Sequence, residues 1–202
     1  MEIYIVRHGE TIWNADKRIQ GRADIELNTN GRELAGITGK ALEDVDFDRI
    51  YASPLIRAYE TACLLRGYRN IPIIRDERLK ELSFGVFEGA SFPEKLADLD
   101  HPFHHFFKHP ELYVAPPEGE TLEELCIRAK SFMAEIIEPL EESVDRIMIV
   151  AHGAFNKGIM SHIKEHDISE FWSGGLQKNC NIIIIKYENN RYTIIDETVI
   201  LY

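Results

Sequence analysis

Two short apolar runs of the chain are almost uninterrupted, and each ends at a histidine followed by a glycine. The first is Ile3–Gly9, with Arg7 and His8 at its end, and the second is Ile147–Gly153, which contains His152. Both runs are rich in branched residues and do not alternate with polar positions, so they predict strands buried on both faces of a parallel sheet. Ligands of open α/β sheets gather at the carboxyl ends of the strands. The two histidines are therefore expected to meet at one site.

Polar residues with capping character mark the starts of helices. The cluster Asn28–Gly31 precedes a periodic stretch, which predicts a helix that runs to about Glu43. Serine suits an N-cap and proline suits the first helical position, so Ser53-Pro54 predicts a helix that runs to about Arg66. Both helices would follow a buried strand or its loop, as crossovers between parallel strands do.

The clearest helix begins at Thr121. Thr121 and Glu124 stand three residues apart in a capping-box pattern, and an apolar stripe follows at helical spacing. Pro139 is expected to kink or end this helix, because proline lacks the backbone donor that a helix needs. A further helix is predicted from Ala154 to about Ile163, directly after the second apolar run.

The remaining strands come in two pairs. Runs at 49–52 and 71–74 predict short strands, and a proline in the second places it towards an edge of the sheet. Runs at 182–187 and 191–195 flank Asn189-Asn190, which favours left-handed turn conformations. This last pair predicts a C-terminal β-hairpin.

Strands alternate with helices over most of the chain, and this alternation indicates an α/β fold. We expect a three-layer α/β/α sandwich with a mostly parallel central sheet and the hairpin at its end. The 202 residues suit one domain spanning 1–202, and 45% of them are hydrophobic, which is enough for a sizeable core. A proline-rich, aromatic segment at about 86–120 fits neither strand nor long helix. It predicts a helical and irregular excursion that covers the active site.

The charge balance argues against some classes of binding partner. Lys and Arg number 23 and Asp and Glu number 34, so the net charge is −11 with neutral histidines. An acidic surface repels nucleic acid and anionic lipid, and neither is an expected partner. A phosphorylated substrate would have to be drawn in by a local positive pocket.

The chain carries no signal for export or membrane insertion. No apolar stretch approaches the about 20 residues that a spanning helix needs, and the N-terminal segment is a strand with an acidic residue. The three cysteines, Cys63, Cys126 and Cys180, show neither metal-ligand nor redox-motif spacing. These observations predict reduced thiols and a cytoplasmic protein.

Arg7, His8, Arg57 and His152 all stand at or just beyond the expected carboxyl ends of strands. Two guanidiniums and two imidazoles above one sheet edge form a pocket for a tetrahedral anion. Arginine binds phosphate oxygens in bidentate fashion and stays charged, and a neutral imidazole can act as a covalent nucleophile. Phosphoryl transfer also needs an acid for the leaving oxygen. Glu81 and Glu88 are the candidates, and we favour Glu81, which directly follows Leu79-Lys80.

The motifs around these residues resemble those of the histidine phosphatase superfamily, the phosphoglycerate mutase-like proteins. The similar segments follow the order of the family and span most of the chain. They are Arg7–Asn14, Gln20–Leu27, Ala52–Ala62, Leu79–Gly89 and Val150–Gly153. The resemblance implies a phosphomonoesterase, a metal-independent phosphatase of the histidine acid type, which acts on a small phosphorylated metabolite without a cofactor.

The resemblance also implies a role for each site residue. His8 would be the phosphohistidine nucleophile, and Arg7, Arg57 and His152 would hold the phosphoryl oxygens. Glu81 would protonate the leaving alkoxide and then help to activate water. Asn14 would be a further phosphate contact, and Gln20 would touch the phosphate or the substrate. Metal ligands are not expected, because the arginines take the charge role of a metal.

Two alternatives stay open within the resemblance. The chain could be a phosphoglycerate mutase, but mutases of this type carry more basic residues in the middle excursion and a longer mobile tail. Here the middle is acidic and aromatic, and the chain ends soon after the hairpin, so hydrolysis is favoured. The second alternative is a domain that binds a phosphorylated ligand or a partner without catalysis. The chain keeps each residue that the chemistry needs, which argues against it.

A group of histidines in the excursion could be considered as candidate metal ligands. His101, His104, His105 and His109 fit no familiar ligand spacing, and no cysteine accompanies them. We therefore expect a solvated segment or one that lines the pocket. The identity of the substrate and the oligomeric state have no signal in the sequence.

Overall fold

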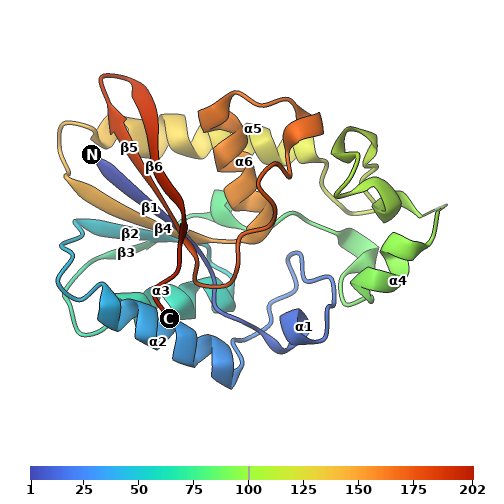
Figure 1. Ribbon diagram of the computed structural model, residues 1–202, viewed down its shortest axis with the longest axis horizontal. Helices are drawn as coiled ribbons and strands as arrows, with labels where there is room; N and C mark the ends of the chain where they lie inside the picture. The colour runs from blue at the N-terminus through green and yellow to red at the C-terminus, as the bar shows by residue number, and fades with distance from the viewer. Residues whose placement is uncertain (100) are drawn as a thin grey trace.

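The computed structural model describes residues 1–99 and 101–202 of the chain. A six-stranded sheet lies at its centre, in the order β3-β2-β4-β1-β5-β6 (Figure 1). The first four strands in this order are mutually parallel, and β5 and β6 are antiparallel to their neighbours. The strands are β1 Glu2–Arg7, β2 Arg49–Ala52, β3 Ile73–Arg75, β4 Arg146–Ala151, β5 Ile182–Glu188 and β6 Arg191–Val199. The expected mostly parallel sheet with a C-terminal hairpin is confirmed.

Helices cover both faces of the sheet and give the expected three layers (Figure 1). α5 and α6 lie over one face, and α2 and α3 lie over the other. The α-helices are α1 Ile12–Ala15, α2 Thr29–Ala41, α3 Ile56–Arg66, α4 Phe92–Ala97, α5 Leu122–Phe132 and α6 Gly153–Lys164. Among the described residues, no helix combines the length and the apolar character needed to cross a membrane.

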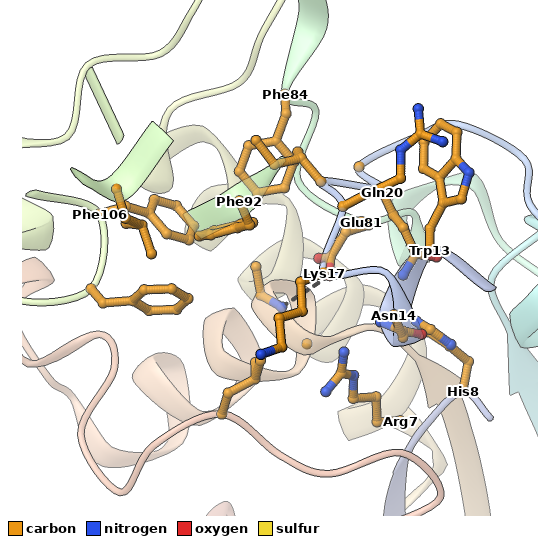
Figure 2. Close-up of a pocket in the computed structure, with 18 of the residues that line it drawn as sticks. Arg7, His8, Trp13, Asn14, Lys17, Gln20, Glu81, Phe84, Phe92 and Phe106 are labelled. Carbon is orange, nitrogen blue, oxygen red and sulfur yellow. Dashed lines mark hydrogen bonds between the residues drawn. The ribbon is translucent and has the colours of Figure 1, made fainter. Parts of the chain in front are cut away.

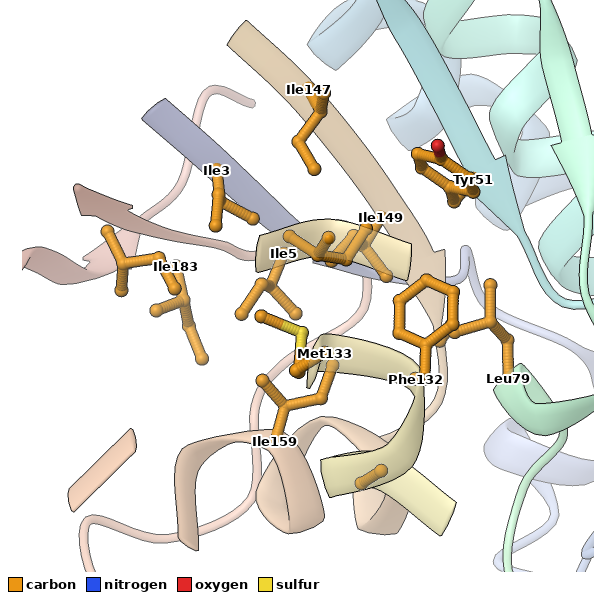
Figure 3. Packing of buried hydrophobic residues seen from close by; sticks show 14 of the residues in the cluster. Ile3, Ile5, Tyr51, Leu79, Phe132, Met133, Ile147, Ile149, Ile159 and Ile183 are labelled. Carbon is orange, nitrogen blue, oxygen red and sulfur yellow. The ribbon is translucent and has the colours of Figure 1, made fainter. Parts of the chain in front are cut away.

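The two central strands separate the hydrophobic core into two halves. Alternate residues of β1 face opposite sides, so Ile3 and Ile5 pack with α5 and α6 while Val6 packs with α2 and α3. Figure 3 shows the first half, in which Ile5 and Ile149 lie against Met133. Burial on both faces explains why these strands read as continuous apolar runs.

Local signals place several elements as expected. Thr121 and Glu124 form both hydrogen bonds of the capping box at the start of α5. This helix then widens into a π-helical turn over Met133–Ile137 and a 3₁₀ turn over Glu138–Leu140, which contains Pro139. In the hairpin turn, Asn189 and Asn190 have φ values of 53° and 58°. The strand with the early proline, β3, is an edge strand.

The helix start predicted at Ser53-Pro54 is wrong. α3 begins at Ile56, and its N-cap Leu55 makes no side-chain capping bond. The Ser53 hydroxyl accepts the Leu55 N–H at 3.3 Å, just before the helix, and also lies 2.8 Å from Nε2 of His152. It thus supplies the polar partner that a buried imidazole nitrogen needs.

The segment between β3 and α5 leaves the sheet and forms a third core cluster. Its described part contains α4 and four 3₁₀ turns, at Glu77–Leu79, Gly85–Phe87, Pro102–His105 and Pro110–Leu112. Its aromatic rings pack against Phe171 and Trp172 from the chain after α6. Trp172 Nε1 donates a 2.6 Å hydrogen bond to the carbonyl of Phe106. Ala90 accepts a backbone bond from Ile19, which joins this segment to the loop after β1.

Candidate active site

His8 and His152 meet at the carboxyl ends of adjacent parallel strands. Arg7 of β1 is paired with Ala151 of β4, so the next residue on each strand is a histidine. Their ring centroids lie 5.1 Å apart. The register of two strands thus brings together residues that are 144 positions apart in the sequence, as the apolar runs predict.

The hydrogen bonds of His8 determine which ring nitrogen is free. Nδ1 lies 2.7 Å from the Gly9 carbonyl, which can only accept, so Nδ1 carries the proton. Burial and the charges of Arg57 and Arg7 hold the pKa of His8 well below its usual range. The ring is therefore neutral, and its Nε2 lone pair is available for attack on an electrophile.

His152 is buried completely and stands at the N-terminus of α6. Its Nε2 lies 2.8 Å from the Ser53 hydroxyl, while its Nδ1 has no partner among the described residues. Burial first, and then the Arg57 charge and His8, hold the pKa of His152 well below its usual range. Ser53 therefore sets the orientation of this ring and leaves the other nitrogen for a ligand.

Two arginines bring positive charge to the same place. Arg57, buried in the first turn of α3, donates to the carbonyls of Gly21 at 2.7 Å and Ala23 at 2.8 Å. Burial lowers its pKa to about 10, so it stays charged at neutral pH. Arg7 is half-buried and donates to the Gln177 carbonyl at 2.6 Å. Among residues 1–99 and 101–202, neither arginine is ion-paired with a carboxylate.

Within the described part of the chain, three buried nitrogens of these residues have no hydrogen-bond partner. They are Nε of Arg7, Nε of Arg57 and Nδ1 of His152. An unsatisfied buried donor costs about 1–3 kcal/mol, and more when it is charged. A bound oxyanion can supply acceptors to such donors and neutralise guanidinium groups. The three nitrogens therefore mark a candidate anion site.

Thr11 orients the two amide side chains. Its backbone N–H, which can only donate, lies 3.1 Å from Oδ1 of Asn14, and its hydroxyl lies 3.0 Å from Oε1 of Gln20. The amide oxygens are thus occupied, and the NH₂ ends are left as donors. Both residues line the cavity that contains His8. Thr11 has no assigned role in the sequence prediction, although it lies inside the first motif.

Glu81 lies in the loop after the 3₁₀ turn Glu77–Leu79 and lines the cavity beside the start of α6. Its Oε1 accepts N–H bonds from Leu82 and Phe155, both at 3.0 Å, and its Oε2 accepts one from Ala154 at 3.2 Å. These bonds fix the position of the carboxyl group. Glu88, the other candidate acid, instead accepts bonds from the backbone of Arg22 and Phe84 and does not line the cavity.

Several positioning residues have no clear signal in the sequence. Arg128 and Glu120 form a bidentate ion pair, and Arg128 also donates to the Glu81 carbonyl at 3.0 Å. Thr61 accepts the Gly9 N–H at 2.9 Å and so holds the turn after His8. These partners come from distant elements, so only the fold shows that they belong to the site.

The site residues line one side of a cavity of about 370 Å³. In Figure 2, Arg7, His8 and Asn14 lie on one side, Phe84, Phe92 and Phe106 lie on the other, and Glu81 and Lys17 lie between them. The structure therefore brings Arg7, His8, Asn14, Gln20, Arg57 and Glu81 to one cavity. His152 does not line this cavity, but its ring centroid lies 5.1 Å from that of His8. Within the described part of the chain, no cluster of three metal-ligating side chains occurs, the histidine-rich segment included.

The neutral state of the buried imidazoles gives the stability of the protein a pH dependence. The unfolded histidines titrate near pH 6.5, whereas the folded pKa values of His8 and His152 are depressed. Below pH 6.5 the unfolded chain binds protons that the folded chain rejects. Each group should then lower the free energy of unfolding by up to about 1.4 kcal/mol per pH unit. Urea unfolding between pH 7.5 and 5.5 measures this slope.

The control separates these two histidines from the exposed ones. His109→Gln removes an exposed imidazole that does not line the cavity, and its slope should match that of the wild type. His152→Asn should remove the contribution of one histidine to the change in the free energy of unfolding with pH. A flat stability between pH 7.5 and 5.5 would show that the folded protein accepts these protons.

Comparisons with known proteins give matches over nearly the whole chain. The sequence model of the histidine phosphatase superfamily (branch 1) matches residues 3–198. An uncharacterized phosphatase PhoE of Bacillus subtilis is 32% identical over 198 residues, which cover 98% of this chain and 94% of the relative. Phosphoserine phosphatase 1 of Hydrogenobacter thermophilus is 28% identical, over 96% of this chain and 90% of the relative. The structure of Bacillus stearothermophilus YhfR superposes with a TM-score of 0.89 at 35% identity, covering 97% of this chain and 96% of that one.

Proposed function

Because the chain belongs to branch 1 of the histidine phosphatase superfamily, we propose that it hydrolyses small phosphomonoesters through a phosphohistidine on His8. The observation that carries this proposal is the group of unpartnered buried nitrogens on Arg7, Arg57 and His152. The rings of His8 and His152 lie 5.1 Å apart, and the charges of Arg57 and Arg7 act on the neutral imidazole of His8. Hydrogen-bond donors fixed in advance stabilise developing charge without reorganisation, which suits phosphoryl transfer.

In the first half-reaction, Nε2 of His8 attacks the phosphorus atom. A P–N bond forms, and the P–O bond to the alcohol breaks. Glu81 gives its proton to the departing alcohol oxygen. Arg7 and Arg57 hold the equatorial oxygens, and His152 donates from Nδ1. The amide ends of Asn14 and Gln20 supply further donors.

In the second half-reaction, water attacks the phosphorus of the phosphohistidine. Glu81, now ionised, accepts a proton from this water. The P–N bond breaks, its electron pair returns to Nε2, and inorganic phosphate leaves. His8 and Glu81 are then in their starting states, so the cycle needs no external proton donor.

The proposal predicts phosphatase activity in the presence of a chelator. With p-nitrophenyl phosphate as substrate, the rate of phosphate release should be the same with and without EDTA, because the arginines carry the positive charge that the reaction needs. Loss of activity on chelation, or no release from any phosphomonoester, would contradict hydrolysis by this site. Interconversion of 2- and 3-phosphoglycerate faster than any phosphate release would identify a mutase instead.

A further inference from the structure

The cavity has two halves of different chemistry. The half at the strand ends carries Arg7, His8 and Arg57, which suffice for a phosphoryl group. The other half is lined by side chains with no role in phosphoryl transfer. They are Phe84, Phe92, Phe106, Phe107 and Trp172. In Figure 2, the rings of Phe84, Phe92 and Phe106 lie on the side of the cavity away from Arg7 and His8.

These rings form a continuous wall rather than scattered contacts. The centroid of Phe107 lies 5.4 Å from that of Phe92 and 4.9 Å from that of Trp172. Phe106 is 1% exposed and lies 5.1 Å from Trp172, whose Nε1 is fixed by its hydrogen bond to the Phe106 carbonyl. Phe92, Phe107 and Trp172 are only half-buried, so packing leaves part of their surface to the cavity.

Positive charge predominates in the cavity. Its cations are Arg7, Arg57, Lys17 and Arg18, and the one carboxylate among the described lining residues is Glu81. Both Glu81 oxygens accept backbone N–H bonds. An ammonium group on the substrate would therefore be repelled by four cations and would find no carboxylate in the aromatic half.

From this division we infer the substrate class: phosphomonoesters of bulky apolar alcohols that carry no positive charge. The inference rests on the proposed function and narrows it. Phosphoserine, named for one relative, carries an ammonium group that this wall would leave unpaired. An apolar alcohol instead covers the exposed ring surfaces and releases water from both partners.

Three primary alkyl phosphates with similar leaving oxygens test the inference. The kcat/KM for 2-phenylethyl phosphate should exceed that for ethyl phosphate by about 50-fold, as expected from burying one phenyl ring. The kcat/KM for O-phosphoethanolamine should lie below that for ethyl phosphate. Equal values for 2-phenylethyl and ethyl phosphate, or a preference for the amine, would overturn the inference. Hydrolysis itself would stand in those cases, whereas no release from any of the three esters would count against the proposed function.

Phe107 allows a matched pair of variants. Phe107→Ser should lower the 2-phenylethyl to ethyl ratio by about 5-fold, and Phe107→Leu should retain most of it, because leucine keeps an apolar surface. The ratio within one preparation is independent of the fraction of folded enzyme. Leu112→Ser is the control, since Leu112 is 54% exposed and does not line the cavity. An unchanged ratio in Phe107→Ser would show that the wall does not contact the alcohol.

Discussion

Replacement of His8 by alanine should lower kcat for phosphate release by about 10⁴-fold or more, as loss of a nucleophile does in other enzymes. The proposed mechanism forms a covalent bond to Nε2, and no other histidine of the described residues lines the cavity. His152 stands beside His8, but its Nε2 is bound to Ser53 and its ring is buried completely. Steady-state release from p-nitrophenyl phosphate measures the loss.

A second variant and a chemical test show whether the lost activity is due to loss of the His8 nucleophile. His8→Asn retains a polar side chain and should be as inactive as His8→Ala, while the exposed His109→Ala should retain wild-type activity. Rapid acid quench of the wild type with ³²P-labelled substrate would destroy a phosphohistidine, whereas alkaline quench should preserve it. Turnover of His8→Ala within about tenfold of the wild type, or an acid-stable label, would place the nucleophile elsewhere.

The meeting of Arg7, His8 and His152 could be predicted from sequence because of one physical rule. Strands buried on both faces show continuous apolar runs, and parallel strands end at the same edge of a sheet. β1 and β4 obey this rule in adjacent positions and in register. The proposed roles of these residues go beyond geometry and depend on the experiments described above.

Predictions from local sequence signals were wrong where tertiary contacts determine the structure. Ser53 has the composition of a helix cap, yet it bonds the His152 ring. In the helix after Asn28, the buried face consists of small residues rather than large apolar ones. Ile37 is 43% exposed, while Ala35 and Gly39 are buried. A Cβ at Gly39 would lie 2.6 Å from the Leu64 carbonyl oxygen, so α2 approaches α3 too closely for the larger side chains.

The aromatic wall shows the limit of sequence reasoning most directly. A segment rich in phenylalanine and proline predicts that the rings are buried. It does not predict which residues they pack against. Its position depends on Trp172, which lies 66 residues after Phe106 and fixes that residue by a hydrogen bond. Contacts of this separation are set by the closed fold and leave no periodic pattern, so the shape of the cavity had to come from the structure.

Replacement of Arg57 by alanine should lower kcat/KM by about 10²-fold to 10³-fold, the usual effect of removing a donor that stabilises the transition state. The Arg57 guanidinium is buried and spans two carbonyls, at Gly21 and Ala23, so it also fixes the loop that carries Gln20. Arg57→Lys should be nearly as inactive, because one ammonium cannot bond both carbonyls and a phosphoryl oxygen in the geometry of a guanidinium. Replacement of the exposed Arg32 by alanine, which breaks ion pairs with Glu60 and Glu26 outside the cavity, should leave the kinetics as in the wild type.

Competitive inhibition by inorganic phosphate separates anion binding from stability in this experiment. If Arg57 holds a phosphoryl group, the inhibition constant of phosphate should rise by at least about 10-fold in both Arg57 variants, since a charge-assisted hydrogen bond contributes about 1.5–3 kcal/mol. Urea unfolding at the assay pH reports how much folded enzyme each variant contains, and the constant itself does not depend on that amount. Unchanged phosphate inhibition in Arg57→Lys, alongside lost turnover, would mean that Arg57 acts only by holding the Gly21 and Ala23 carbonyls. The anion would then be held by Arg7, His152 and the amide groups of Asn14 and Gln20.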